Sequence, residues 1–232
     1  VGDINTAKNY YQKAIAINRS YAPALTNLGS IELNSGNKQE ALSLLTKAIE
    51  SDPKLALSWK NLANGYVQLG KTQLAEIACR KSIKLNPNLF NSHFFLGMLL
   101  IRQKKLQEAK QPLRKTIELN PNFFQAHHNL GVVLQELGQL QEAELSTRKA
   151  IKLNPDFAEA YLNLGTILSD LGKSQDPELF YCKAIEINPN FAKAYYSLSL
   201  LKYSEENKIW QNQLFSKSIL KNKLPKDKLD IY

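Results

Sequence analysis

The side chains best suited to chemistry are three histidines and two cysteines. Cys79 and Cys182 lie far apart, and neither belongs to a CxxC or a Cys/His spacing typical of zinc ligands. No Ser/His/Asp set, glycine-rich phosphate loop or carboxylate pair occurs at a useful spacing. The sequence therefore predicts no catalytic residue, no metal and no cofactor, and it indicates that the chain is not an enzyme.

The composition describes a chain that folds but carries excess positive charge. Of its 232 residues 44% are hydrophobic, enough for a buried core, and the formal net charge is +9. That charge keeps nucleic acid or an anionic membrane surface open as partners until its location is known. No apolar run is long enough to span a membrane and no signal peptide is visible. Because the chain begins with Val1 and looks cut from a longer protein, its localisation is left unknown, with a cytoplasmic one only weakly favoured.

A 34-residue period organises the whole chain. Lys-x-Ile recurs seven times at this interval, from Lys13 to Ile219, and so do five prolines. The prolines are Pro53, Pro87, Pro121, Pro155 and Pro189. We therefore divide the chain into repeats 22–55, 56–89, 90–123, 124–157 and 158–191, a partial repeat 1–21, a degenerate repeat 192–225, and the start of a further helix at 226–232. Both ends fall inside repeats, so we expect residues 1–232 to be one array cut from a longer protein.

Each repeat is expected to form two helices. Apolar residues at helical spacing run from Ala158 to Gly172, where the glycine is a common helix stop. A second helix is expected from about Gln141 to Leu153, ended by Asn154-Pro155 in the preceding repeat. No β pattern is present, so the sequence predicts an all-α protein.

This pattern resembles the tetratricopeptide repeat (TPR). Repeat 124–157 carries the expected Leu130-Gly131 at positions 7 and 8, Gly138 at 15, Ala143 at 20, and Pro155 at 32. The resemblance covers nearly the whole chain and implies a right-handed α-solenoid, or superhelix, of antiparallel helix pairs. In such arrays a leucine fills the seam between repeats and small residues let paired helices approach closely. The cysteines, several repeats apart, are then too distant to bond.

Three departures from the TPR pattern carry further expectations. Pro177 replaces the alanine of position 20, so we expect a shifted, shorter second helix that begins at Asp176-Pro177. Repeat 192–225 loses its glycine, alanine and proline markers and should pack less regularly. His93 and His127 occupy position 4, where other repeats have Leu, Trp or Tyr, and we expect both to be packing residues.

The resemblance implies that first-helix positions 2, 5, 6, 9, 12 and 13 line a concave groove. Position 6 is asparagine in four repeats: Asn27, Asn61, Asn129 and Asn163. Amide side chains offer one acceptor and two donors, and such a row suits the backbone of an extended peptide. It is similar to the asparagine ladder in the repeat array of O-GlcNAc transferase. The alternative is that these asparagines only cap or solvate their helices.

The row is interrupted in repeat 90–123, where the groove positions include Phe94, Phe95, Met98 and Arg102. Exposed apolar clusters usually mark binding sites, and Val132, Leu162 and Tyr196 extend this one. The alternative is a local shift of register that buries Phe94 or Phe95.

A carboxylate clamp, the second known binding mode of such arrays, is incomplete. Lys60 and Asn64 supply its first pair, but Phe95 replaces the required asparagine, and His128 and Val132 replace the second pair. We therefore reject a clamp, and keep Lys60, Asn64 and His128 as groove residues.

The excess charge lies outside the groove. Lys60, Arg102 and Lys193 balance three acidic groove residues, Glu136, Glu159 and Asp170. The excess falls on the second helices, where a lysine recurs at position 26 and complements the helix dipole. A convex surface without interleaved aromatic residues is a poor nucleic-acid platform, so we regard nucleic acid as an improbable partner.

These observations favour a scaffold that binds an extended peptide or partner protein in its concave groove, without a membrane. A second interpretation is a non-catalytic, substrate-presenting module of a larger transferase-type enzyme whose catalytic domain follows Tyr232. A third is self-association through the ends of the array.

Overall fold

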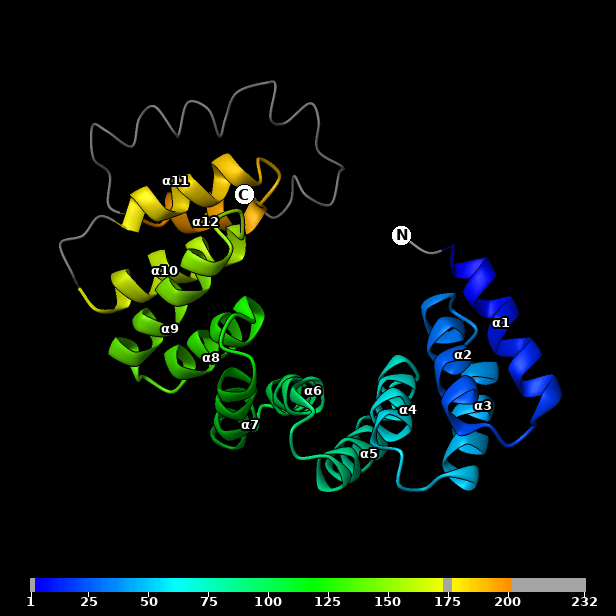
Figure 1. The fold of residues 1–232 in the computed structure, drawn as a ribbon. Coiled ribbons are helices and arrows are strands. Elements are labelled where there is room, and N and C mark those ends of the chain that lie inside the picture. The colour runs from blue at the N-terminus through cyan, green and yellow to red at the C-terminus, as the bar shows by residue number, and fades with distance from the viewer. Residues whose placement is uncertain (1–2, 173–176, 202–232) are drawn as a thin grey trace. The chain divides into compact units, whose positions relative to one another are not determined.

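The computed structural model describes residues 3–172 and 177–201 and divides into two compact units, 1–121 and 122–232. Every regular element in the described residues is a helix (Figure 1). Consecutive helices pack as antiparallel pairs, with α4 against α3 and α5, and α10 against α9 and α11. The prediction of an all-α solenoid of helix pairs is therefore confirmed.

The helix bounds follow the predicted period. The first unit contains α1 (Ile4–Ile17), α2 (Ala22–Asn34), α3 (Lys38–Ser51), α4 (Ala56–Gln68), α5 (Thr72–Leu85), α6 (Phe90–Arg102) and α7 (Leu106–Leu119). The second contains α8 (Phe124–Glu136), α9 (Leu140–Leu153), α10 (Ala158–Asp170), α11 (Pro177–Ile187) and α12 (Ala192–Ser199). The helices α2, α4, α6, α8, α10 and α12 thus begin at the first residue of each predicted repeat.

The turn between the two helices of a repeat needs a residue with left-handed backbone conformation, that is, a positive φ, at position 15. Gly36, Gly70, Gly138 and Gly172 adopt φ between 60° and 85° there. In repeat 90–123 the position is Lys104, which adopts φ 61° although its Cβ disfavours that conformation. The turn geometry is therefore imposed by the packing of α6 and α7, even where the sequence lacks the glycine.

The departure at Pro177 lies next to residues that the structure does not describe. Helix α11 is described over Pro177–Ile187, 11 residues, whereas α3, α5, α7 and α9 have 14 each. The other second helices begin at position 17, which is residue 174 here, so the predicted shift and shortening stay a prediction. The predicted cap Asp176 lies outside the described residues. Of the degenerate repeat 192–225 the structure describes α12 and its end, so the expected irregular packing of the remainder and the further helix at 226–232 lie outside as well.

Close approach of the two helices in a repeat is set by positions 8 and 24. A Cβ on Gly97 would lie 2.8 Å from Leu113, and one on Gly165 would lie 2.6 Å from Tyr181. Repeat 56–89 has Ala63 instead of glycine, and its residue at position 24 is the small Cys79. Both are fully buried. The residues at the two positions therefore share limited space, although repeat 124–157 keeps Gly131 even beside the small Thr147.

Neighbouring repeats are joined by buried leucines and by one recurring hydrogen bond. The seam leucines at position 7 are at most 6% exposed: Leu28, Leu62, Leu96, Leu130, Leu164 and Leu198. The residue at position 4 forms a hydrogen bond to the carbonyl oxygen of the proline six residues earlier. The bond is 2.9 Å long from the indole nitrogen of Trp59, 2.8 Å from the Nε2 atom of His93 and 3.3 Å from the hydroxyl of Tyr195. His93 is thus a packing residue as predicted, and His127 is buried like it.

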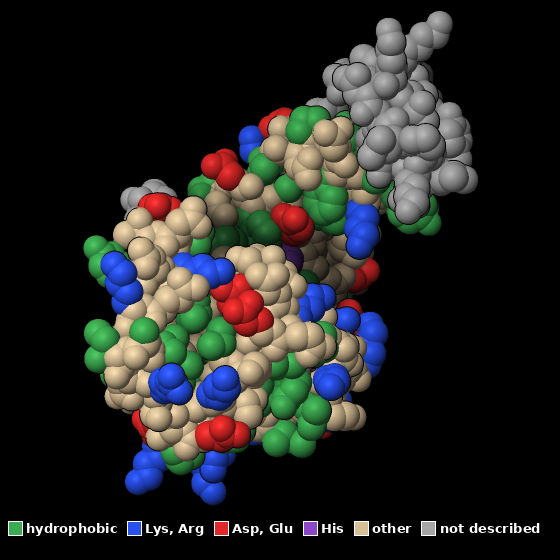
Figure 2. Space-filling view, turned by 90° about the vertical axis from the view of Figure 1, so that its right-hand side faces the viewer, with side chains coloured by type: hydrophobic (Ala, Val, Ile, Leu, Met, Phe, Trp, Pro, Cys, Tyr) green, Lys and Arg blue, Asp and Glu red, His purple; other side chains and the backbone are tan. Residues whose placement is uncertain are grey.

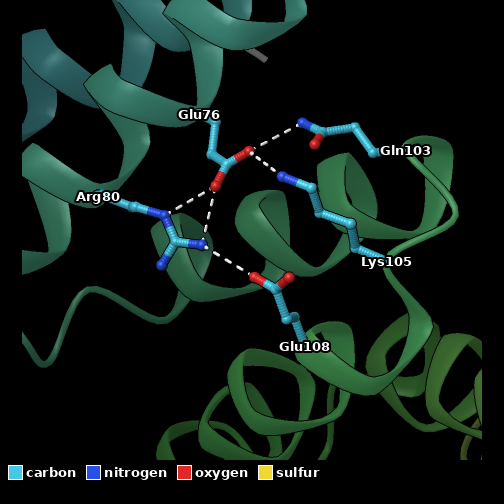
Figure 3. A network of polar contacts seen from close by, with 5 residues as sticks. All are labelled: Glu76, Arg80, Gln103, Lys105 and Glu108. Carbon is cyan, nitrogen blue, oxygen red and sulfur yellow. Dashed lines mark hydrogen bonds and ion pairs between the residues drawn. The ribbon is translucent and has the colours of Figure 1, made fainter.

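An ionic network joins repeats 56–89 and 90–123 (Figure 3). Glu76 of α5 accepts hydrogen bonds from Arg80 at 2.9 Å, from Gln103 at 3.0 Å and from Lys105 at 3.3 Å. Arg80 also lies 3.5 Å from Glu108 of α7. Burial alone would raise the pKa of Glu76, but these three donors together lower it below its ordinary value. The carboxylate therefore stabilises the fold in its charged form.

The shared volume predicts a strong coupling between positions 8 and 24. Gly97→Ala should destabilise the wild-type chain by about 1–2 kcal/mol, because overpacking against Leu113 outweighs the gain in helix propensity. In a Leu113→Cys background, which reproduces the Ala63–Cys79 combination, the same change should be neutral or stabilising. Urea unfolding of the four proteins measures the coupling, and equal effects of Gly97→Ala in both backgrounds would contradict it.

The network predicts a pH-dependent role for Glu76. Because the folded state lowers the pKa of Glu76, its contribution is complete above about pH 5 and is lost as the pH falls through the folded value. Glu76→Gln should therefore lower stability by about 1 kcal/mol at pH 7 and much less at pH 3. Urea midpoints at both pH values test this. Glu118→Gln, which removes an exposed carboxylate paired with Lys115, should have little effect, and a pH-independent loss in Glu76→Gln would refute the assignment.

Candidate functional site

A cavity of about 620 Å³ opens among the first helices of the second unit. Helix α10 packs against α8 and α12, and all three contribute to the lining. The lining residues are His128, Val132, Glu159, Leu162, Asn163, Thr166, Phe191, Ala192 and Lys193. Seven of these occupy groove positions 2, 5, 6 or 9 of their repeats, so the cavity lies on the face predicted to hold a ligand.

The walls of this α8–α10–α12 cavity are largely apolar. Val132, Leu162 and Phe191 are partly buried and present aliphatic and aromatic surface to the space. Glu159 of α10 and Lys193 of α12 are exposed, and both occupy position 2 of their repeats. The arrangement is an apolar hollow with one charge of each sign among its lining residues.

His128 is the most unusual polar group of the cavity. Its ring packs edge-on against Phe157, with centroids 4.8 Å apart, and Phe157 packs edge-on against Phe124 at 5.1 Å. The Nδ1 atom is buried without a hydrogen-bond partner. Burial lowers the pKa of His128 to about 4, and the charge of Glu159 opposes this only partly. The imidazole is therefore neutral at physiological pH.

Asn163 is held by a neighbouring helix. Its amide nitrogen donates to the hydroxyl of Thr147 on α9 at 3.2 Å, which fixes the side-chain plane and leaves the amide oxygen able to accept. The hydroxyl of Thr166 donates to the carbonyl of Leu162 at 3.0 Å. The cavity thus offers a ligand the Asn163 amide and the two charged side chains.

The asparagine, lysine and histidine residues predicted from sequence have different surroundings. In the first unit, Asn61 is only 4% exposed and accepts a hydrogen bond from Lys60 at 3.3 Å, while Asn64 is partly buried. Burial lowers the pKa of Lys60. Asn27 and Asn129 are also partly buried. Of the predicted site residues, the cavity brings together His128 and Asn163.

The predicted apolar interruption lies on α6 of the first unit. Met98 is 45% exposed and Arg102 is exposed, whereas Phe94 and Phe95 are partly buried. Val132 and Leu162, expected to extend this patch, line the cavity of the second unit. Tyr196 is 55% exposed and is not among the lining residues.

Sequence reasoning missed one wall of the cavity. Phe191 occupies position 34, directly before α12. It is therefore not among the predicted groove positions, which all lie within the first helix of a repeat. A signal was available, because position 34 is apolar in every repeat: Leu55, Leu89, Phe123, Phe157 and Phe191. Each of these residues lies in the turn directly before a first helix, from which Phe191 reaches the face that lines the cavity.

The basic residues of the second helices are partly neutralised. Arg148 lies 3.0 Å from Glu144, Lys183 lies 2.8 Å from Glu186, and Lys81 lies over the ring of Trp59. On the face shown in Figure 2, basic side chains are scattered among acidic and hydrophobic ones. The positive charge on this face therefore forms no continuous patch.

Residues 3–172 and 177–201 contain neither a metal-binding cluster nor a membrane-spanning helix. No three His, Cys, Asp or Glu side chains of these ranges gather closely enough to hold a metal ion. No helix in the same part of the chain is both long and apolar enough to cross a membrane. Cys79 and Cys182 are both buried and are not joined in a disulfide.

Solved TPR proteins have the same fold. The TPR protein YrrB superimposes with a TM-score of 0.71 at 24% identity, over 82% of this chain and 98% of its own. PilF of Pseudomonas aeruginosa superimposes with a TM-score of 0.75 at 23% identity, over 90% of this chain and 94% of its own. MamA superimposes with a TM-score of 0.65 at 23% identity, over 78% of this chain and 97% of its own. No curated protein matches the chain significantly.

The family model of the cilia and flagella-associated protein 70 C-terminal domain, a TPR domain, matches residues 1–195. This range includes all the repeats whose helix pairs are fully described, together with the lining residues of the cavity. The chain therefore belongs to the family of the cilia and flagella-associated protein 70 C-terminal domain and is a TPR protein.

Proposed function

We propose that the chain is a protein-interaction scaffold that binds an extended peptide segment of a partner protein in the α8–α10–α12 cavity. The observation that carries this proposal is the coincidence of an apolar hollow with a fixed, unused amide oxygen on Asn163. Apolar hollows with a few placed polar groups are typical ligand sites. YrrB, which has the same fold, is described as having a peptide-binding site.

The geometry suits an extended chain. An extended peptide presents its own backbone N–H groups, and the oxygen of Asn163 can accept from one of them whatever the side chain. Val132, Leu162 and Phe191 can then cover one or two apolar side chains of the same segment. Backbone and side-chain recognition therefore occur on adjacent walls.

The first unit offers further groove residues for the same purpose. Lys60, Asn61 and Asn64 form a polar group on α4, and Phe94 and Met98 an apolar one on α6. Asn27 lies on α2, and Asn129 on α8 of the second unit. We propose these residues as ligand contacts within their own units, in addition to the residues that line the cavity.

A charged substitution in the cavity wall tests the proposal. Peptides selected from a random phage-displayed library on the wild-type chain should bind Leu162→Lys at least about tenfold more weakly, because a lysine there desolvates or blocks the apolar hollow. The matched control is Leu145→Lys on α9, where the leucine is 70% exposed and lines no part of the cavity. Fluorescence anisotropy gives the affinities, and circular dichroism establishes equal helicity.

Two results would count against this function. Selection of no peptide by the wild-type chain would remove the support for peptide binding. Equal affinities of the wild-type and Leu162→Lys proteins would place the binding surface elsewhere on the chain.

The neutral state of His128 predicts how the site responds to pH. Since the folded pKa is about 4 and the unfolded one about 6.5, unfolding takes up a proton between these values. His128 therefore lowers the free energy of unfolding as the pH falls from about 6.5 towards about 4. Because the folded ring stays neutral from pH 8 to about pH 5.5, we expect no change of peptide affinity from its titration in that range. An NMR titration of the ring, with the urea-unfolded chain as reference, tests this, and a folded pKa near 6.5 would disprove it.

A further inference from the structure

Two charges of opposite sign occupy equivalent places in neighbouring repeats beside the cavity. Position 2 is Glu159 on α10 and Lys193 on α12, and both side chains are exposed and line the cavity. In the four preceding repeats position 2 is uncharged: Pro23, Leu57, Asn91 and Gln125. Neither charged side chain forms an ion pair or a hydrogen bond with another residue of 3–172 or 177–201. Both are therefore open to charged groups of a ligand.

The two charges border the apolar part of the same cavity. Leu162 follows Glu159 by three residues on α10, so these two side chains lie on one face of that helix. Phe191 and Ala192 directly precede Lys193 at the start of α12, and both line the cavity. An apolar ligand side chain in the hollow therefore has a carboxylate near it on the α10 side and an ammonium group on the α12 side.

The order of the two charges along the groove follows from the order of the helices. Burial lowers the pKa of His128 on α8, and the charge of Glu159 opposes that shift, so the field of this carboxylate reaches towards α8. Lys193 lies on α12, which packs against α10 on the other side. A peptide that runs across these first helices therefore meets the negative charge and then the positive one, or the reverse.

The separation of the helices sets the spacing of the groups that a ligand must carry. Packed helices have axes about 8–10 Å apart. An extended peptide advances about 3.3 Å per residue. A peptide that crosses from α10 to α12 therefore advances about three residues between the place beside Glu159 and the place beside Lys193.

We propose, building on the proposed function, that the α8–α10–α12 cavity selects an extended peptide with a basic and an acidic residue about three positions apart and an apolar residue between them. The basic residue pairs with Glu159, the acidic one with Lys193, and the apolar one enters the hollow beside Leu162. A peptide bound in the reverse direction would place like charges together, which is unfavourable. The two lining charges therefore fix the direction of the ligand as well as its composition.

The test uses peptides whose binding depends on the cavity, that is, those lost in Leu162→Lys and kept in Leu145→Lys. We expect these peptides to share the two opposite charges, always in the same order along the sequence. Exchange of the basic and the acidic residue within such a peptide should weaken binding about tenfold, because two attractions become two repulsions. Salt at about 0.5 M should reduce this difference to about threefold or less, since exposed charges are screened.

The matched protein variant exchanges the two charges of the cavity. Glu159→Lys combined with Lys193→Glu keeps the net charge and should prefer the charge-exchanged peptide over the original about tenfold. The control is Asp156→Lys combined with Lys152→Glu, which alters two exposed residues of the same unit that line no part of the cavity. It should keep the wild-type preference. The ratio of the two affinities is the readout, since a loss of folding would weaken both peptides alike.

The outcomes separate this inference from the proposed function. Cavity-dependent peptides that lack the charge pair, or carry it in either order, would overturn the inference and leave peptide binding intact. An unchanged preference in the variant with both cavity charges exchanged would also overturn it, because the ligand charges would then be read elsewhere. If no selected peptide depends on the cavity, both proposals fail together.

Discussion

The close crossing of the two helices within each repeat is the constraint on which the rest of the fold depends. A single helix pair cannot bury its apolar stripe, so the pairs must stack, and they stack regularly only if each pair has the same separation. Gly97 against Leu113 and Ala63 beside Cys79 reach that separation by different means. A common backbone geometry then lets one seam leucine per repeat fit the same gap.

This regularity bears on the proposed binding site. The seam and the helix crossing use positions 4, 7, 8 and 24, and the cavity is lined mainly by the first-helix positions 2, 5, 6 and 9. In the second unit these positions carry Val132, Leu162 and Asn163 on α8 and α10. The hydrogen bond from Asn163 to Thr147 shows that a second helix also orients a groove residue. The seam and the proposed binding surface therefore use mostly different positions within the repeat, and Thr147 at position 24 links the two.

The sequence predicted the fold closely because the repeat signal is redundant. Helix starts and the seam leucines follow from residues that recur. The cavity was predicted less well. It lies on the predicted face of the first helices, whose role in binding stays a prediction. The contribution of Phe191 depends on how the turn before α12 approaches that face. The isolated nitrogen of His128 depends on burial beside Phe157, and no spacing in the sequence reports it. Lys104 is a case in which the structure keeps a feature that the sequence does not predict. The turn between α6 and α7 has the left-handed conformation although a lysine, and not a glycine, occupies that position.

The shared volume at positions 8 and 24 also restricts how such repeats can diverge. A repeat that starts with glycine and leucine reaches the alanine and cysteine of repeat 56–89 by two substitutions. With the alanine alone the pair is overpacked, and with the cysteine alone a cavity replaces most of the buried leucine side chain. Either order of substitution therefore passes through a less stable intermediate, so the two positions are expected to change together.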